Sequence, residues 1–231
     1  MAETKPEASK RGIGKDAVME ARGDARTWSW AASGAEADAR RLDADKLVGE
    51  RLREIRYFTL DYRRDELHPD LIDGGPRTID AESEWDDPPW LYDGFDAVDY
   101  GFEMITESGA TFSLTWDPPR DHEGIGLQPI PMLGSGVRRD ADVAIWPLGE
   151  RAASWSALIG SRIAGVDLHY LPWDEERGSM WCPHITFRGE QGRVEVVLGD
   201  SRAGRLFPSA DNVAVLHPDA YLPAWPSSAR E

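Results

Sequence analysis

The chain has 231 residues, a formal net charge of −16 and ten tryptophans, and 41% of its residues are hydrophobic. That apolar content is enough to bury a core, because each buried tryptophan removes a large apolar area from water. The strong negative charge repels phosphate backbones, so we expect no binding to nucleic acid.

The N-terminal region, residues 1–33, is rich in Ala, Glu, Lys, Arg and Gly and has no hydrophobic periodicity. Such a composition buries too little apolar surface to become ordered, so we expect a flexible, disordered tail. The region has no apolar stretch of the kind that secretory signals need, and no run of about 18 apolar residues occurs in the chain. A single cysteine, Cys182, cannot form an internal disulfide. We therefore predict a cytoplasmic protein without membrane attachment.

A helix followed by a strand is predicted after this tail. Residues 35–49 are good helix formers and end on Gly49, a typical C-terminal stop. We expect Leu42 and Leu47 to lie on one side of this helix. Residues 51–62 then become β-branched and aromatic, which is typical of a strand.

A similar order of features recurs later in the chain. Residues 47–55 align with residues 158–166, with apolar residues, a glycine and an arginine at matching positions. A predicted β-hairpin follows each copy, over residues 99–117 and 183–200, and each hairpin has a polar turn that contains glycine. We infer an internal duplication.

These patterns predict an α+β protein that is mainly antiparallel β. We expect two related β-rich halves, residues 34–150 and 151–231, each preceded by a short helix. An acidic, aromatic insertion occupies about residues 61–99 of the first half, and the second half ends in an extended strap.

The stretch Gly199-Asp200-Ser201 follows a predicted buried strand. It resembles the first sequence block of the GDSL-type esterases, and this resemblance implies that Ser201 is a nucleophile. In the repeat alignment, however, the stretch lies opposite Trp116-Asp117-Pro118, at the end of a hairpin strand, and no Asp-x-x-His block follows it. We therefore predict a turn that ends the strand.

Two short motifs place potential metal ligands on common strand faces. Asp167 and His169 are two residues apart, as are Cys182 and His184, so each pair points to one side of its strand. If the two strands pair, these four side chains could converge on zinc. The alternative interpretation is half-buried histidines and a packed cysteine, and on this basis we predict no bound metal and no cofactor.

Three further histidine motifs are predicted to be turns. Residues 121–123 read Asp-His-Glu within a proline-rich stretch, which is typical of a solvated loop. The tripeptide His-Pro-Asp occurs at residues 68–70 and again at 217–219. Proline restricts the backbone there, and aspartate can cap the residues that follow.

The acidic insertion is the strongest functional candidate. Between Asp61 and Asp99 there are thirteen acidic residues and three arginines, and residues 82–95 alternate carboxylates with aromatic side chains. Carboxylates steer a basic partner, while aromatic side chains supply rigid contact area. The predicted partner-binding residues are Trp85, Asp86, Asp87, Trp90, Tyr92, Asp93 and Asp96. In the alternative interpretation, this is a solvated loop whose aromatic residues fill the core.

The functional prediction is a non-enzymatic, intracellular protein-binding module with a basic protein as its partner. An inhibitor or immunity-type protein that neutralises a basic effector, such as a nuclease toxin, is its concrete form. One alternative is a small enzyme that uses Asp167, His169, Cys182 and His184, with or without a metal. Another is a structural subunit of a larger assembly. The sequence makes no prediction about the oligomeric state.

Overall fold

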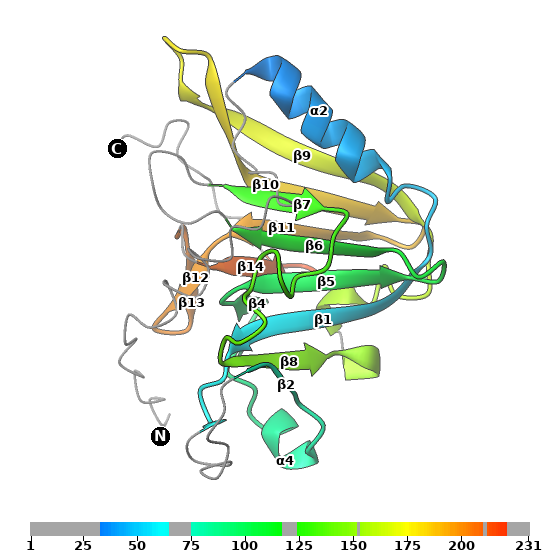
Figure 1. The fold of residues 1–231 in the computed structure, drawn as a ribbon, viewed down its shortest axis with the longest axis vertical. Helices are drawn as coiled ribbons and strands as arrows, with labels where there is room; N and C mark the ends of the chain where they lie inside the picture. The colour runs from blue at the N-terminus through cyan, green and yellow to red at the C-terminus, as the bar shows by residue number, and fades with distance from the viewer. Residues whose placement is uncertain (1–32, 65–74, 117–123, 152, 210–211, 221–231) are drawn as a thin grey trace.

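A computed structural model describes residues 33–64, 75–116, 124–151, 153–209 and 212–220, and it shows two six-stranded sheets packed face to face (Figure 1). The first sheet has the order β2 (Arg77–Thr78), β8 (Val143–Pro147), β1 (Leu52–Leu60), β5 (Gly101–Thr106), β6 (Thr111–Trp116) and β7 (Ile125–Gln128). All neighbouring strands in it are antiparallel except β2 and β8.

The second sheet has the order β3 (Leu91–Tyr92), β4 (Phe95–Val98), β14 (Val213–Leu216), β11 (Arg193–Leu198), β10 (Ser179–Gly189) and β9 (Ile163–Asp174). It is antiparallel throughout. A small two-stranded sheet pairs β12 (Asp200–Arg202) with β13 (Arg205–Phe207). The prediction of a mainly antiparallel β protein with few helices is confirmed.

The core lies between the two sheets. Tyr57, Phe102 and Leu114 are cross-strand neighbours on the inner face of the first sheet, and all three are fully buried. Phe102 contacts Trp155 edge-to-face, with the ring centroids 4.8 Å apart, and Phe187 of the second sheet at 6.4 Å. Side chains alternate between the faces of a strand, so the alternating apolar residues of both sheets meet in one layer.

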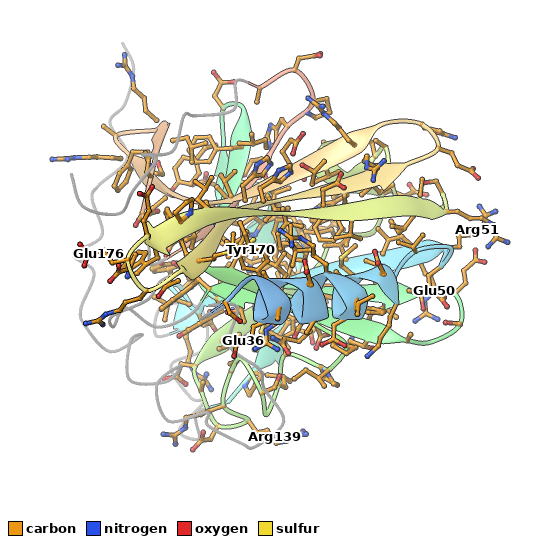
Figure 2. The ribbon with its side chains drawn as sticks, turned by 90° about the horizontal axis from the view of Figure 1, so that it is seen from above. Glu36, Glu50, Arg51, Arg139, Tyr170 and Glu176 are labelled. Atoms are coloured by element: carbon orange, nitrogen blue, oxygen red, sulfur yellow. The ribbon has the colours of Figure 1, made fainter. Side chains whose placement is uncertain are left out.

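Helix α2 (Gly34–Asp45) lies along the edges of the two sheets, beside β7 and β9 (Figures 1 and 2). Ser33 caps its N-terminus by accepting a hydrogen bond from the Glu36 amide at 3.3 Å.

The predicted apolar side of this helix is only partly correct. Ala37 and Ala44 are buried, and Leu47 is buried in the turn after the helix, but Leu42 is 68% exposed. Five residues rotate a helix by about 140°, which turns Leu42 away from the face that carries Ala37. The two alanines let the helix approach the sheets closely.

Two sets of four neighbouring strands repeat the same order. The first set lies in the first sheet, in the order β1, β5, β6 and β7. The second set lies in the second sheet, in the order β9, β10, β11 and β14. Both predicted hairpins are confirmed as β5–β6 and β10–β11, and Gly109 and Gly192 adopt positive φ angles of 87° and 159° in their turns.

The aligned residues before β1 and β9 bind each other reciprocally. Arg51 donates to the carbonyl of Gly160, and Arg162 donates to the carbonyl of Gly49 at 2.7 Å. Both glycines are in the left-handed region, with φ angles of 88° and 75°. The glycine and arginine positions of the sequence alignment thus occupy equivalent places in the two sheets.

The second sheet also takes strands from the first predicted half. β3 and β4 precede residue 150, but β4 pairs with β14. The acidic insertion therefore connects the two sheets.

Several sequence predictions fall outside the described residues. These are the tail before Ser33, the His-Pro-Asp motif at 68–70, the Asp-His-Glu motif at 121–123 and the strap after residue 220. Among the residues that the structure does describe, no helix is long and apolar enough to cross a membrane.

Candidate functional site

The acidic segment, defined here as residues 80–96, is attached to the core by its tryptophans. Trp90 contacts Tyr57 edge-to-face, with the centroids 5.0 Å apart, and Trp146 at 5.9 Å. Trp85 contacts Trp146 in the same way at 5.1 Å. Trp90, one of the predicted partner-binding residues, is only 4% exposed and packs in the core. Its indole Nε1 has no hydrogen-bond partner among the described residues.

Buried ion pairs attach the same segment to the first sheet. Arg77 of β2 makes two hydrogen bonds to Asp61, at 2.9 and 3.0 Å, and two to Glu84, both at 2.8 Å. Glu84 lies in the short helix α4 (Glu82–Trp85), and Asp61 follows β1. The hydrogen bonds that the Arg77 guanidinium donates to Glu84 and Asp61 raise its pKa. This cluster holds α4 against β1 and β2.

Asp96 lies at the centre of a buried hydrogen-bond network. Its Oδ2 accepts hydrogen bonds from the hydroxyls of Tyr57 and Ser154, both at 2.7 Å, and its Oδ1 lies 2.8 Å from Nε2 of His217. Trp155 in turn donates its indole N–H to the Tyr57 oxygen at 2.8 Å. Burial and the charge of Asp96 raise the pKa of the Tyr57 hydroxyl. Asp96, another predicted partner-binding residue, has a side chain only 3% exposed, and its hydrogen bonds join the two sheets.

The remaining predicted residues lie at the surface. Asp86, Asp87 and Asp93 are exposed, and Tyr92 is partly exposed and stacks on Phe95 with the rings 5.2 Å apart. Trp85 is also partly exposed.

Two exposed hydrophobic side chains were not predicted as contact residues. Leu91, in the acidic segment, is 44% exposed, and Tyr62, which follows β1, is 43% exposed. Leu91 lies on the two-residue edge strand β3, where a side chain on the outer side meets solvent.

A second cluster lies on the outer face of the second sheet. His169 of β9 and His184 of β10 are direct cross-strand neighbours, and their rings stack with centroids 4.1 Å apart. Nε2 of His184 lies 2.7 Å from Oε2 of Glu195, which also accepts the Thr186 hydroxyl at 2.5 Å. Nε2 of His169 lies 2.8 Å from the Thr186 oxygen. Glu195 and Thr186 were not predicted, although the register of the β10–β11 hairpin places them opposite each other.

Burial, hydrogen bonds and neighbouring charges shift the pKa values of two groups in this cluster. Burial alone would raise the pKa of Glu195, but hydrogen bonds from His184 and Thr186 outweigh it and lower that pKa. Burial and the neighbouring His184 lower the pKa of His169. These directions favour an ionised Glu195 carboxylate and a neutral His169 imidazole at neutral pH. A carboxylate that orients an imidazole is an arrangement suited to proton transfer.

The other two candidate metal ligands have other partners. Asp167 forms an ion pair with Arg188 at 2.7 Å, and Cys182 is buried with its thiol 3.3 Å from the His184 carbonyl. The β9–β10 register shifts between Trp181 and His184, so Cys182 leaves the regular face alternation that the prediction assumed. In the described parts of the chain, no three His, Cys, Asp or Glu side chains gather to hold a metal.

Ser201 lies in a short strand. β11 ends at Leu198, as expected, but the predicted turn at Gly199-Asp200-Ser201 is wrong, because the chain enters β12 at Asp200 and Ser201 pairs with Leu206. The Ser201 amide donates to the Asp200 carboxylate at 2.6 Å.

Comparison of the chain with protein-family models, with curated proteins and with solved structures finds no match. The class that the fold defines is a two-sheet antiparallel β-sandwich closed by one helix along its edges.

Proposed function

We propose that this chain is a non-enzymatic, cytoplasmic protein-binding module that recognises a basic protein through the acidic segment. An inhibitor or immunity-type protein that neutralises a basic effector is the concrete form of this proposal. The observation that carries it is the attachment of the segment by Trp85, Trp90, Arg77 and Asp96, which leaves carboxylates exposed on a fixed backbone.

Attachment of this kind favours binding for a physical reason. A loop that is already ordered loses little conformational entropy when a partner docks, so more of the contact energy appears as affinity. Exposed carboxylates at Asp86, Asp87 and Asp93 attract Lys and Arg side chains and accelerate encounter, while Leu91 and Tyr92 offer apolar contact. The partner would be neutralised by occlusion of its basic surface.

The test is affinity capture from a lysate of the native host at low salt, followed by binding kinetics with the identified partner. The variant Asp86→Lys, Asp87→Lys, Asp93→Lys should lose a basic partner that the wild type retains. A matched control is Glu175→Lys, Glu176→Lys, Glu190→Lys, which changes the net charge equally at exposed positions in two hairpin turns. We expect this control to bind, and the wild-type association rate to fall as salt increases. Equal loss in both variants, or a salt-independent rate, would contradict the proposal.

A second candidate function is a small enzyme centred on His169 and His184. The hydrogen bond between Glu195 and His184 favours it, because the carboxylate fixes the orientation of the imidazole. Hydrolysis of activated esters by the wild type that is lost in both His169→Gln and Glu195→Gln would support this candidate. Activity that persists in the two variants would argue against it.

We also infer that the two sets of strands arose by duplication. The equal strand order and the reciprocal contacts of Arg51 with Gly160 and of Arg162 with Gly49 support this inference.

A further inference from the structure

An arginine of the chain itself occupies part of the acidic segment. The guanidinium carbon of Arg151 lies over the Trp85 ring, 4.7 Å from its centroid. Its Nη2 lies 2.6 and 2.7 Å from the two carboxylate oxygens of Glu82. Glu82 and Trp85 are three residues apart in α4, so their side chains lie on the same side of that helical turn. A carboxylate and an aromatic ring thus bind one guanidinium between them.

This contact holds the arginine weakly at an open position. The side chains of Arg151 and Glu82 are 47% and 82% exposed, and exposed ion pairs contribute little to stability because water and salt screen them. Trp85, by contrast, is held in place by Trp146 and Trp90. A competing cation can therefore displace Arg151 without disturbing the ring.

The chemistry of the contact selects arginine over lysine. A planar guanidinium stacks on an aromatic face while its N–H groups bind a carboxylate, whereas an ammonium is a strongly hydrated point charge. We propose that Glu82 and Trp85 form an arginine-binding site, that Arg151 occupies it in the free protein, and that an arginine of a basic partner replaces Arg151 in the complex. This inference rests on the proposed function and identifies the partner residue that the acidic segment recognises.

The experiment measures the binding of labelled hexa-arginine and hexa-lysine peptides to the full chain by fluorescence anisotropy at two salt concentrations. Removal of the internal competitor in Arg151→Ala should tighten hexa-arginine binding by roughly three- to tenfold. Arg177→Ala is the matched control, because it removes the same charge from an exposed arginine that is paired with Asp174 in the β9–β10 hairpin. Arg151→Lys should tighten hexa-arginine binding as well, since lysine is the weaker competitor.

A second pair of variants tests the site itself. In the Arg151→Ala background, Glu82→Gln should weaken hexa-arginine binding several-fold more than Glu176→Gln does, and the affinity for hexa-lysine should differ little between the two. Equal effects of Arg151→Ala and Arg177→Ala, or equal responses of the two peptides, would overturn the arginine site. Binding that is lost only when Asp86, Asp87 and Asp93 are changed to lysine would keep the proposed function while overturning this site. Peptide binding that is insensitive to all these variants would overturn both.

Discussion

The hydroxyl of Tyr57 donates a hydrogen bond to the carboxylate of Asp96 at 2.7 Å, and this contact joins the two sheets inside the core. Tyr57 belongs to β1 of the first sheet and Asp96 to β4 of the second. Because β4 ends the acidic segment, the same contact positions that segment relative to the core. A buried carboxylate is tolerated here because three side chains hydrogen bond to it.

Removing the Tyr57 hydroxyl should destabilise the fold. We expect Tyr57→Phe to lower the free energy of unfolding by about 2 kcal/mol, because Asp96 loses a donor and Trp155 loses its acceptor. Tyr62→Phe is the matched control: Tyr62 also donates to an aspartate, Asp99, at 2.7 Å, but its side chain is exposed. Tyr62→Phe should lower the free energy of unfolding by at most about 1 kcal/mol. Urea denaturation measures both, and equal costs would show that burial does not strengthen the Tyr57 contact.

Replacing the buried arginine of the acidic segment should cost more. Arg77→Leu leaves Asp61 and Glu84 without their cation, and their side chains are only 2% and 3% exposed. We expect a loss of about 3–5 kcal/mol in unfolding free energy. Arg138→Leu, which breaks an exposed pair with Asp140, should cost no more than about 1 kcal/mol. Chemical denaturation compares them, and a small loss in Arg77→Leu would mean that the segment is not held by this cluster.

The stacked histidines should titrate in a characteristic way. The pKa of His169 is lowered by burial and by His184, so NMR should show it titrating below the ordinary value of about 6.5. His184→Gln should raise this pKa, whereas Glu195→Gln should lower it further, because Glu195 favours the charged form. As pH falls, His169 takes up its proton in the unfolded chain before it does so in the folded protein. Its contribution to stability therefore falls as pH drops from about 6.5 to the folded pKa, and it does not recover at lower pH. A His169 pKa that neither substitution moves would contradict the stacked arrangement.

Glu103 should give the opposite pH dependence. This buried residue of β5 accepts the Met132 amide at 2.7 Å, and burial raises its pKa despite that hydrogen bond. The folded state then retains the proton longer than the unfolded state, so this group makes the protein less stable as pH rises above about 4.3. The free energy of unfolding of Glu103→Gln, relative to that of the wild type, should therefore increase from about pH 4 to about pH 7. Urea midpoints at the two pH values test it, and a constant difference would contradict the raised pKa.

Local patterns predicted the regular elements well. The alternation of residues 51–62 corresponds to β1, and the polar turns with Gly109 and Gly192 correspond to the two hairpins, because strand pairing across a short turn depends on neighbouring residues. The repeat of glycine and arginine also marked positions that are equivalent in the structure.

The candidate site was predicted less completely. Carboxylates and aromatic residues alternate along the acidic segment, but alternation does not say which of them face the core. Trp90 and Asp96 were predicted as partner-binding residues, and the structure buries both. Trp90 packs on Tyr57 and Trp146, and Asp96 accepts the Tyr57 hydroxyl, so their burial depends on strands distant in sequence. Thr186 and Glu195 were missed because their contact with the histidines depends on a register among three strands.

The sequence by itself determined an acidic, mainly antiparallel β protein with two similar sets of strands, because composition, strand alternation and turn residues are local properties. Only the tertiary structure decided that β3 and β4 cross to the second sheet, that Asp96 lies between the sheets and that Arg151 covers Trp85. These contacts join residues far apart in the chain, and their formation depends on how the two sheets pack, which no local pattern records.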